Sequence, residues 1–593
     1  MCGIVGFTGK RDAKEIVLNG LKKLEYRGYD SAGMSLFNLY DSRFDVFKET
    51  GRVNKLVQNT LNTRLSYCGI GHTRWATHGK VTKENAHPHV SSSGRFIIVH
   101  NGVIENSEEL YRQYLPDYKL KSETDTEIIA HLIEMFSKQL AVNNAIVTSL
   151  KLLKGSYALL VVDNENPEII YAAKNRSPLL IGTSKEGTTI ASDVLALNGY
   201  SKNYVPLKDH TFAICGPERT SFFNFELERL NIEYLEVGNN FEDSELGVFD
   251  HFMLKEIYEQ PKIINRLVKK YIKEDDIHID KKIINDINES DRIYILAAGT
   301  SMHAGMLGKR YLEKLSGMPT EVHIASEFAY HVPLLSSKPY FILITQSGET
   351  ADLRASLKAI EHFNRPVLTI TNVMTSTLAR EASYFLDVKA GPEIAVASTK
   401  AYIAQASVLL ILAYSLSNKA YPVKEVLSKL ANNMEVFLAN QQMDTIARDF
   451  LDMRHAFFIG RGINYDLALE AALKLKEISY IQTEGFAAGE LKHGTIALIE
   501  EGTPVFALIS DEHMNHQTRS NLKEVDARGA KTCVITLRSL SKASDHVILE
   551  DVDSLVAPLL LVLPTQLLSY YAALQRGFDI DKPRNLAKSV TVE

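Results

Sequence analysis

The sequence predicts a mixed α+β domain at the N-terminus, followed by two related α/β domains with parallel sheets. Short apolar runs bounded by Gly, Asn, Ser and Pro occupy the chain up to about residue 235, which is typical of strands with tight connections. From about residue 285 onward, apolar strands alternate with long amphipathic helices, the pattern of a parallel sheet. This second part also repeats itself, which indicates a duplication.

Strands and helices both appear in the N-terminal region. The apolar runs Arg95–Val99, Tyr157–Val162 and Glu168–Ala173 predict strands. Apolar residues recur at helical spacing over Asp12–Glu25 and Asp125–Gln139, so we expect helices there. This mixture predicts an α+β domain.

The repeat rests on two pairs of segments at nearly one spacing. Tyr294–Ser301 resembles Phe457–Asn464, 163 residues later, and Phe341–Gly348 resembles Val505–Glu512, 164 residues later. Each segment of the first pair is an apolar strand followed by a turn that contains glycine. The two copies differ in their turns, because the first keeps small hydroxyl residues and the second carries acids and a histidine.

A polar, acidic stretch separates the two parts of the chain. Gly238–Gly247 has the composition of a linker, and Asp250–Lys270 then predicts a helix that breaks near Pro261.

Composition excludes several classes of protein. The chain has 593 residues and a formal net charge of −6, with a pI near 6.3, so we expect neither nucleic acid nor a membrane as partner. Its four cysteines form no CxxC pair, and no secretory signal pattern is present. The longest apolar runs, Val408–Ala413 and Leu559–Leu563, fall far short of the ~20 residues that span a bilayer. We expect a soluble, cytoplasmic protein.

Cys2 directly follows Met1. Removal of Met1 would give this residue both a thiol and a free α-amine, and an α-amine titrates near pH 7.7–8.0, which suits a base for the thiol. The alternative is a small apolar residue without a chemical role, and position alone does not decide between them.

Three further segments of the N-terminal region carry groups suited to binding an amino acid. Arg74 can clamp a carboxylate with two parallel hydrogen bonds. Asn101 and Gly102 follow an apolar strand and can form an oxyanion hole. Asp125 can bind an ammonium group, although it can equally cap the helix that it precedes.

The histidines of this region do not predict a metal site. His87 and His89 are close in sequence, but no acid or cysteine cluster accompanies them. The alternative is a set of ordinary buried histidines, and we expect no metal.

Three hydroxyl-rich loops of the first α/β copy suit a phosphate monoester. They are Gly299–Ser301, Thr345–Thr350 and Ala397–Lys400. Ligands of parallel α/β folds bind at the carboxyl ends of the strands, where helix N-termini attract anions. Each loop alone could be a helix cap, but all three occur in one copy and not in the other. The nucleotide-binding pattern GxxxxGK[ST] is absent from the sequence.

Longer motifs resemble known families. The N-terminal motifs are MCGIVG, LEYRGYDSAG, HTRWATHG, HNG and SETDTE. They resemble the class II (N-terminal-nucleophile) glutamine amidotransferases, which implies an αββα sandwich. The second part resembles paired sugar isomerase (SIS) domains. The whole chain, to its last segment NLAKSVTVE, resembles the isomerising glutamine–fructose-6-phosphate aminotransferase family.

The resemblance implies five segments. They are the glutaminase domain (1–238), a linker with a connecting helix (239–282), the first SIS domain (283–425), the second SIS domain (450–583) and a C-terminal tail with Lys588 (584–593).

It also implies an activity. Members of the family convert D-fructose 6-phosphate and L-glutamine to D-glucosamine 6-phosphate and L-glutamate, the first step of the hexosamine (UDP-N-acetylglucosamine) pathway. Ammonia passes from the glutaminase site to the sugar site, and neither cofactor nor metal is expected.

In the glutaminase domain, the resemblance implies Cys2 as nucleophile with its own α-amine as base, and Asn101 and Gly102 as the oxyanion hole. The residues implied for glutamine binding are Arg74, Trp75, Thr77, His78, His87 and Asp125. Trp75 is also the gate residue between the two sites.

In the SIS domains, the resemblance implies a sugar-phosphate site and a separate catalytic set. The residues implied around the sugar phosphate are Thr300, Ser301, Thr345, Gln346, Ser347, Thr350, Val396, Ser398 and Ala587. Two positions, Ala298 and Thr345, differ from the Cys and Ser of many relatives, and we expect modest effects on fit.

The catalytic set implied at the sugar site has four members. Lys588 forms a Schiff base, Glu477 carries the proton, Lys474 stabilises the enolate, and His493 opens the ring. In the family this histidine comes from the neighbouring subunit, which implies a homodimer. Without the resemblance, Lys474 and Glu477 would be an ordinary pair on a helix surface.

Two other amidotransferase classes lack support, because the SGGxDS segment of asparagine synthetases and a phosphoribosyl-pyrophosphate loop are both missing. A non-catalytic sugar-phosphate sensor would need neither Cys2 nor Lys588, and a sugar isomerase with a decayed glutaminase domain would not keep the N-terminal motifs.

Overall fold

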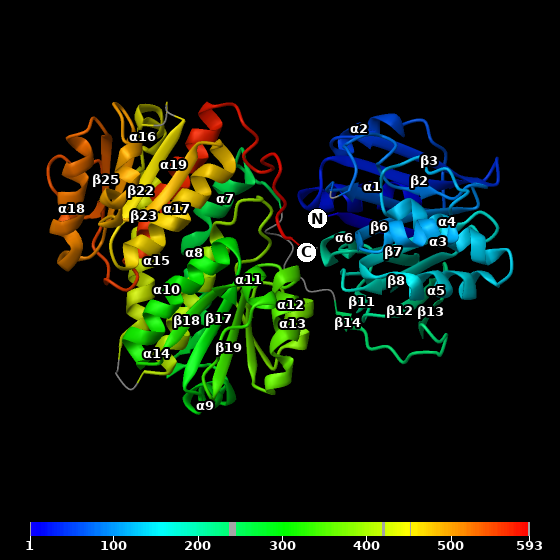
Figure 1. Ribbon diagram of the computed structural model, residues 1–593, viewed down its shortest axis with the longest axis horizontal. Helices are drawn as coiled ribbons and strands as arrows, with labels where there is room; N and C mark the ends of the chain where they lie inside the picture. Colours follow the sequence, from blue (N-terminus) through cyan, green and yellow to red (C-terminus); the bar gives the residue numbers. More distant parts are fainter. Residues whose placement is uncertain are drawn as a thin grey trace. The chain divides into compact units, whose positions relative to one another are not determined.

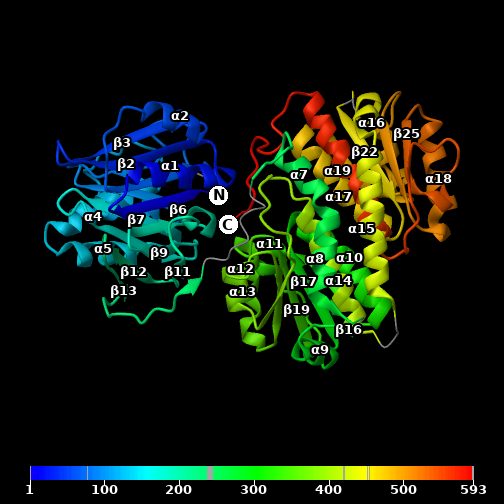
Figure 2. The same ribbon diagram turned by 180° about the vertical axis from the view of Figure 1, so that it is seen from behind.

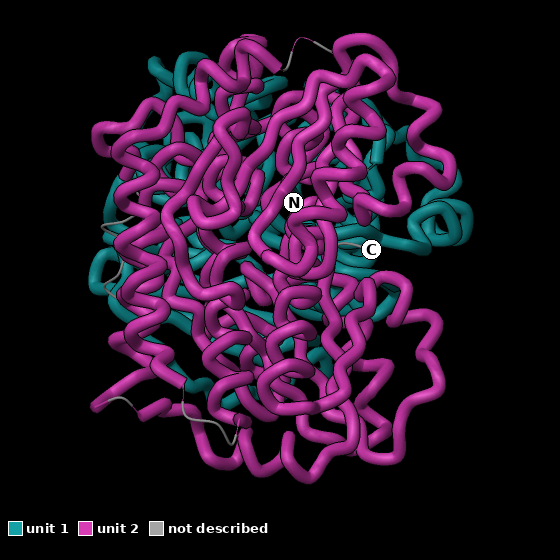
Figure 3. The backbone as a smooth tube through the Cα atoms, turned by 90° about the vertical axis from the view of Figure 1, so that its left-hand side faces the viewer, with its two compact units in different colours: residues 1–241, 589–593 teal, residues 242–588 magenta. Residues whose placement is uncertain are grey.

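The computed structural model describes residues 2–76, 78–236, 245–274, 276–417, 421–450, 452 and 454–590. The chain divides into two compact units, coloured in Figure 3. Unit 1 comprises residues 1–241 and 589–593, and unit 2 comprises residues 242–588. Each unit is described by itself below.

Unit 1 contains two antiparallel sheets (Figure 1). In spatial order, the strands of the first sheet are β14 (Leu235–Glu236), β11 (Asn203–Pro206), β9 (Leu180–Ser184), β10 (Gly187–Ala191), β1 (Gly3–Gly9), β4 (Cys68–Arg74), β2 (Ser31–Asn38) and β3 (Arg43–Thr50). Those of the second sheet are β13 (Thr220–Asn224), β12 (Thr211–Cys215), β8 (Ile170–Asn175), β7 (Gly155–Asp163), β6 (Phe96–Ile104) and β5 (His89–Val90). The strands predicted near residues 95, 157 and 168 are β6, β7 and β8.

Helices cover the outer face of each sheet of unit 1. They are α1 (Ala13–Leu24), α2 (Val53–Asn59) and α6 (Val194–Leu197) on the first sheet, and α3 (Ser107–Tyr114), α4 (Thr126–Ser137) and α5 (Val142–Leu152) on the second. Separate apolar clusters lie under each helix layer and between the sheets, where Ile4 and Ile70 meet Val99 and Leu160. The predicted αββα sandwich is therefore confirmed.

Unit 2 contains two five-stranded parallel sheets with the same strand order. The first sheet runs β18 (Thr320–Ile324), β17 (Arg292–Ala297), β19 (Pro339–Thr345), β20 (Val367–Thr371) and β21 (Tyr384–Asp387). The second runs β23 (Gln482–Ala487), β22 (His455–Gly460), β24 (Pro504–Ile509), β25 (Lys531–Leu537) and β26 (Val547–Leu549). In chain order both read second, first, third, fourth, fifth, so the predicted duplication is confirmed.

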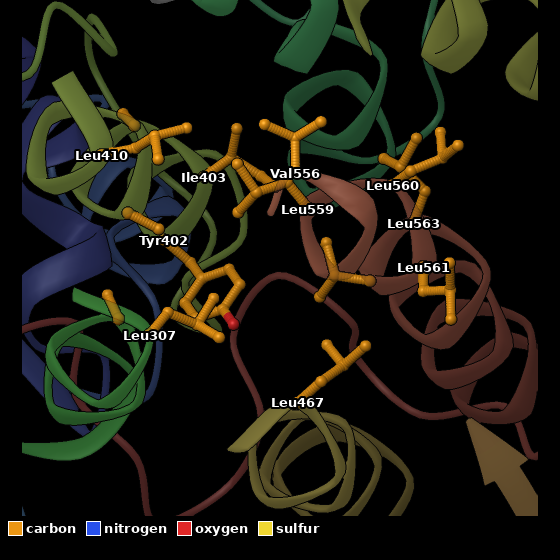
Figure 4. Close-up of a cluster of buried hydrophobic side chains, with 14 of the residues drawn as sticks. Leu307, Tyr402, Ile403, Leu410, Leu467, Val556, Leu559, Leu560, Leu561 and Leu563 are labelled. Carbon is orange, nitrogen blue, oxygen red and sulfur yellow. The ribbon is translucent and has the colours of Figure 1, made fainter. Parts of the chain in front are cut away.

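Long helices fill the space between the two sheets of unit 2 (Figure 2). They include α10 (Gly299–Ser316), α14 (Lys400–Ser415), α15 (Val423–Asn440), α17 (Ile463–Ser479) and α19 (Ala557–Gln575). Apart from α7 and α8, which are described below, the other α-helices of unit 2 are α9 (Lys281–Asn288), α11 (Ala325–Tyr330), α12 (Ala351–Ile360), α13 (Thr377–Glu381), α16 (Met443–Phe450) and α18 (Glu512–Asp526). Leu307 of α10, Tyr402 of α14, Leu467 of α17 and Leu561 of α19 share one apolar cluster (Figure 4). This common core makes the two copies one unit.

Among the described residues, α19 is the one helix long and apolar enough to cross a membrane, and 89% of its apolar stretch is buried inside the protein. Counting uninterrupted apolar runs missed it, because isolated polar residues divide the helix. Its burial explains its composition, since a helix that is apolar all round suits a protein core.

The predicted break near Pro261 is confirmed. Two helices, α7 (Phe252–Tyr258) and α8 (Gln260–Tyr271), meet at Glu259, and Pro261 lies in the first turn of α8, where its missing N–H costs nothing. Most of the predicted linker, residues 238–244, lies outside the described residues.

Candidate active sites

The Cys2 thiol is bracketed by the backbone of Trp75. The Trp75 N–H donates to Cys2 Sγ at 3.3 Å, and Sγ donates to the Trp75 carbonyl at 3.5 Å. This meeting follows from strand pairing, because Gly3 of β1 lies opposite Thr73 of β4. Burial raises the pKa of the Cys2 thiol, while the Trp75 N–H and the Arg74 charge act to lower it. The thiol therefore needs a neighbouring base to become a nucleophile.

Arg74, the last residue of β4, is buried and holds the turn that follows it. Its guanidinium donates to the carbonyls of Gly79 and Lys80, both at 3.2 Å, and to that of His78. Burial lowers the pKa of Arg74, and the nearby charge of Asp125 acts in the opposite direction. A fixed cation and a fixed anion thus lie close together, as the two charged ends of a free amino acid require.

Asn101 links the two sheets of unit 1 at the nucleophile. Its Nδ2 donates to the Cys2 carbonyl at 3.0 Å, and an amide has two N–H donors, so this bond uses one of them. Gly102 has φ +134°, and a Cβ there would lie 2.0 Å from the Ser156 carbonyl oxygen. Only glycine fits this position of β6.

Asp125 precedes α4 but does not cap it. Its Oδ2 accepts from the Ile104 N–H at 2.7 Å, and it makes no capping hydrogen bond. The capping alternative is therefore not supported, and the carboxylate is fixed by β6 instead.

Four buried histidines lie together in unit 1. The rings of His72 and His87 stack at 4.0 Å, His89 meets His87 edge-on at 4.7 Å, and the His100 N–H donates to His87 Nδ1 at 3.2 Å. Burial lowers the pKa of His72 to about 3 and lowers those of the other three. Burial thus favours the neutral form of all four rings, and His87 contacts the other three residues. Within the described ranges, no group of three or more His, Cys, Asp or Glu could hold a metal ion.

Three more of the residues predicted for glutamine binding belong to the segment after β4. Trp75 is half-buried and its ring meets Tyr29 edge-on at 5.9 Å. His78 is exposed, and Thr77 lies outside the described residues.

In unit 2, the hydroxyl-rich loops lie at one edge of the first sheet. β17 and β19 are parallel neighbours, so the segments that follow them emerge side by side. The N-cap residues of α10, α12 and α14 are Ala298, Thr350 and Thr399, and none makes a side-chain capping bond. In α14, the Glu393 carboxylate accepts a hydrogen bond from the Ala401 N–H instead. In α10 and α12 the N-cap side chain therefore accepts no hydrogen bond from the N–H groups of the first turn. N–H groups at a helix N-terminus suit the binding of an anion.

The loop after β19 is held by its own hydroxyl groups. Thr345 Oγ1 accepts from the Gly348 N–H at 3.1 Å and bonds Thr350 Oγ1 at 3.0 Å. Gly348 has φ +68°, and a Cβ there would lie 1.8 Å from Ser376 Oγ. Gln346 and Ser347 are half-buried on this loop, whose shape these internal hydrogen bonds fix.

Lys588 is buried in unit 2 by its pairing with Glu393. Its Nζ donates to Glu393 Oε2, and the two side chains are 3% and 0% exposed. Ser398 Oγ donates to the same carboxylate at 2.8 Å, and the Thr399 and Ala401 N–H groups donate to it at 3.0 Å. Burial acts to raise the pKa of Glu393, but Lys588, the Ala401 N–H and the Ser398 hydroxyl together lower it overall.

The segment that carries Lys588 is anchored at two points before it reaches Glu393. The Asp581 carboxylate accepts from the Phe252 and Met253 N–H groups, both at 2.9 Å, and so caps α7. Further on, the Arg584 N–H donates to Tyr480 Oη at 2.7 Å. These anchors explain why a lysine of the tail is buried.

Two residues predicted around the sugar phosphate adjoin this tail. Ala587 directly precedes Lys588 and is half-buried. Val396 donates its N–H to the Asp581 carbonyl at 2.9 Å, which ties the tail to the segment that follows Glu393.

Helix α17 of the second copy reaches α10 of the first. Lys474 Nζ bonds Glu477 Oε2 at 2.6 Å and lies 3.6 Å from Glu470. Glu470 in turn accepts from Thr300 Oγ1 at 3.2 Å and pairs with His303 Nδ1 at 2.7 Å. Burial acts to lower the pKa of Lys474, but the two carboxylates raise it overall. The first-copy loops and the second-copy helix therefore form one polar network.

The Glu393 charge, which pairs with Lys588, also acts to raise the pKa of Lys474, so this network and the Lys588 pair interact electrostatically. Ser301 follows Thr300 and is half-buried. His493 is different: it is exposed on the 3-10 turn Glu490–His493, and no described bond joins it to the other site residues.

Sequence reasoning missed three residues of this site. Glu470 carried a usable signal, since it lies one helical turn before Lys474. His303 and Glu393 carried none, because their contacts come from packing between segments far apart in the chain.

Comparison with known proteins agrees with this arrangement. The glutamine amidotransferase domain model matches residues 72–199, and the SIS domain model matches residues 286–415 and 449–576. The fold and the two sites thus define a class: a glutamine amidotransferase domain followed by two SIS domains.

Individual relatives narrow the class to one family. Two relatives are the glutamine–fructose-6-phosphate aminotransferases (isomerizing) of Staphylococcus epidermidis and Bacillus licheniformis. They are 52% and 51% identical to this chain, and each comparison covers 100% of this chain and 100% of the relative. The solved C-terminal domain of glucosamine-fructose-6-phosphate aminotransferase from Francisella tularensis is 35% identical, with a TM-score of 0.53 over 57% of this chain and 99% of that one. The chain belongs to the isomerizing glutamine–fructose-6-phosphate aminotransferase family.

Proposed function

We propose that this chain converts D-fructose 6-phosphate and L-glutamine to D-glucosamine 6-phosphate and L-glutamate, the first step of the hexosamine pathway. One observation carries the proposal: a lysine of the final segment, Lys588, is buried against Glu393 beside the hydroxyl-rich loops, in a chain that also has Cys2 bracketed by Trp75. Full-length relatives of the same printed name support it.

In the proposed glutaminase reaction, Arg74 and Asp125 bind the carboxylate and ammonium of glutamine. The α-amine exposed by removal of Met1 takes the Cys2 proton, and the thiolate attacks the carboxamide carbon. The oxygen becomes an anion that the Asn101 side chain and the Gly102 N–H stabilise. The proton returns to the departing nitrogen, ammonia leaves, and water hydrolyses the thioester to glutamate.

Substrate binding in unit 2 rests on the hydroxyl-rich loops and the helix ends beside them. The phosphate is held by the segments Gly299–Ser301 and Thr345–Thr350, and Ser398 and the backbone near Val396 and Ala587 bind the open chain. The Thr345–Gly348 and Thr345–Thr350 bonds support this assignment, because they fix the loop before the ligand arrives.

The sugar reaction begins at Lys588. Ring opening exposes the C2 carbonyl, Glu393 takes the extra proton of Lys588, and the free amine adds to C2 with loss of water to form an imine. Ammonia, passed from unit 1 without release to solvent, displaces the lysine and leaves its nitrogen on C2.

Isomerisation then needs one proton moved between neighbouring carbons. Glu477 removes a proton from C1 and returns it to C2, and the proton that the C1 hydroxyl loses as the aldehyde forms goes to the imine nitrogen, which becomes the amine. Lys474 lies 2.6 Å from Glu477 and offsets the charge of the intermediate.

His493 of the partner subunit opens the ring in this proposal, which therefore includes a cytoplasmic homodimer. The exposure of His493 and its lack of described bonds to its own site support donation across an interface. The segment boundaries expected from the sequence are part of the same proposal, with residues 1–238 as the glutaminase domain.

A paired experiment tests the function. Purified chain is given fructose 6-phosphate and glutamine without nucleotide or metal, and both products are measured by mass spectrometry. We expect C2A to release no glutamate while still binding fructose 6-phosphate, and K588A to form no glucosamine 6-phosphate while still hydrolysing some glutamine. Glutamate release by C2A, or glucosamine 6-phosphate formation by K588A, would contradict the proposal.

A further inference from the structure

Glu256 of α7 is a buried acid that the proposed mechanism does not use. It is 1% exposed, and its Oε1 accepts from the Ala395 N–H at 3.3 Å and, more closely, from the Ile394 N–H. Within the described part of the chain, its Oε2 has no hydrogen-bond partner. These N–H groups belong to the segment between Glu393, which pairs with Lys588, and Val396. Glu256 of α7 therefore holds the backbone of this segment of the sugar site through two hydrogen bonds.

The charges around Glu256 leave it without a cation of its own among the described side chains. Lys588 pairs with Glu393, and Lys400 of α14 pairs with Glu259 at 2.6 Å. Lys255 of the same helix also pairs with Glu259, at 3.3 Å. Helix α19, which packs on α7, presents the Tyr570 hydroxyl to His251.

A lone buried carboxylate is unfavourable, so such a group takes up a proton. Burial and the neighbouring Glu393 charge raise the pKa of Glu256 to about 8, against the opposing effects of Lys400 and Lys588. Oε2 accepts no hydrogen bond from the described residues, so no donor stabilises a negative charge on that oxygen.

We propose that Glu256 is a positioning residue that is protonated in the active enzyme, and that its proton leaves Glu393 as the single anion facing Lys588. Loss of that proton adds a second negative charge beside Lys588. The added charge favours the ammonium form of the lysine, and an ammonium cannot add to a carbonyl. Ionisation of Glu256 thus switches off imine formation. This inference rests on the proposed function of Lys588.

The test compares E256Q with the unaltered chain over pH 6–10, because glutamine is an isostere of the protonated acid. At neutral pH we expect equal rates of glucosamine 6-phosphate formation within about twofold. At pH 9 the unaltered enzyme keeps only about a tenth of its Glu256 protonated, so the ratio of variant to unaltered rate should rise about tenfold. Glutamate release from the same samples should show no such rise, since Cys2 belongs to unit 1. Equal pH profiles for the two proteins would overturn the inference.

Two further measurements keep the inference testable if E256Q folds poorly. Infrared difference spectra of the two proteins at pH 7 should show one protonated-carboxyl band that E256Q lacks. In the unaltered chain alone, a carboxyl band should disappear near pH 8, and a spectrum without such a band would refute the protonated state. E289Q, which changes an exposed acid at the end of α9 in the same way, is the matched control and should keep the unaltered profile.

The outcomes separate this inference from the proposed function. If the unaltered chain makes no glucosamine 6-phosphate at any pH, the proposed function fails. If it makes the product and E256Q has the same profile, only the role of Glu256 fails. E256D supplies a third readout, because its shorter side chain cannot reach the Ile394 and Ala395 N–H groups, and the KM for fructose 6-phosphate should rise severalfold.

Discussion

The candidate sites of the two units differ in the ionisable groups that they bury. Unit 1 keeps His72, His87, His89 and His100 neutral, with pKa values lowered by burial. Unit 2 buries ion pairs, Lys588 with Glu393 and Lys474 with Glu477. The site in unit 1 thus contains buried histidines that burial keeps neutral, whereas the site in unit 2 contains paired charges.

This contrast follows the chemistry that each site is proposed to perform. In the proposed glutaminase reaction the α-amine of Cys2 is the base for the thiol, so the neutral histidine rings can serve as packing. An amine that must form an imine and a carboxylate that must carry a proton need partners that hold their protons until substrate arrives. The predictions below test whether this division is real.

The largest effect should come from Glu393, the centre of the unit 2 ion pair. E393Q leaves Lys588 buried without a counter-charge, a change that costs about 3–5 kcal/mol. Expressed as activity, glucosamine 6-phosphate formation should fall by about 10²–10⁴-fold. Glutamate release in unit 1 should stay near its unaltered value, and a parallel loss of both activities would show that the two sites are not independent in this respect.

The next effect concerns the stability of unit 1 in acid. Its histidines bind protons in the unfolded chain below about pH 6.5, but the folded rings resist protonation. The unfolded state then binds more protons, so stability is complete above pH 6.5 and falls with acid by about 1.4 kcal/mol per pH unit for each histidine. Hydrogen exchange of unit 1 peptides between pH 7 and 5 measures this.

Glu256 gives the stability of unit 2 the opposite dependence on pH, so that it falls as pH rises. Its raised pKa makes the folded state hold a proton that the unfolded state loses above about pH 4.3, so this contribution to stability shrinks as pH rises toward 8.

The variant H89Q tests the contrast between these two pH dependences. H89Q should reduce the acid sensitivity of unit 1 by one proton and leave unit 2 peptides unchanged. Equal slopes in both units would remove the contrast.

His303 offers a smaller test within the unit 2 network. It holds Glu470, which lies 3.6 Å from Lys474, and a hydrogen bond to a charged group contributes about 1.5–3 kcal/mol. H303A should therefore lower kcat for glucosamine 6-phosphate by about ten- to a hundredfold, with little change in KM. H303N, which keeps a donor, should recover part of the loss. A change confined to KM would show that His303 only shapes the phosphate loop.

The sequence predicted unit 1 more completely than unit 2 for a physical reason. Arg74 and Trp75 adjoin in one motif, and strand pairing brings them to Cys2, so local patterns carry most of that site. The parallel sheets of unit 2 and their duplication also followed from the alternating pattern. The burial of Lys588, in contrast, depends on Glu393, and His303 meets its carboxylate partner only because two helices pack together. Contacts between residues so far apart in the chain produce no regular spacing in the sequence from which they could be predicted.

The smallest effect should come from the anchor of the tail at Tyr480. Y480F removes the acceptor for the Arg584 N–H but keeps the ring over which the guanidinium lies at 4.1 Å. The lost hydrogen bond is worth about 1 kcal/mol, because the exposed N–H can bond water instead. Formation of glucosamine 6-phosphate should fall about fivefold while glutamate release stays constant. A loss as large as that of E393Q would mean that the tail, rather than the ion pair, holds Lys588 in place, and the contrast between the units would then be one of segment docking instead of charge.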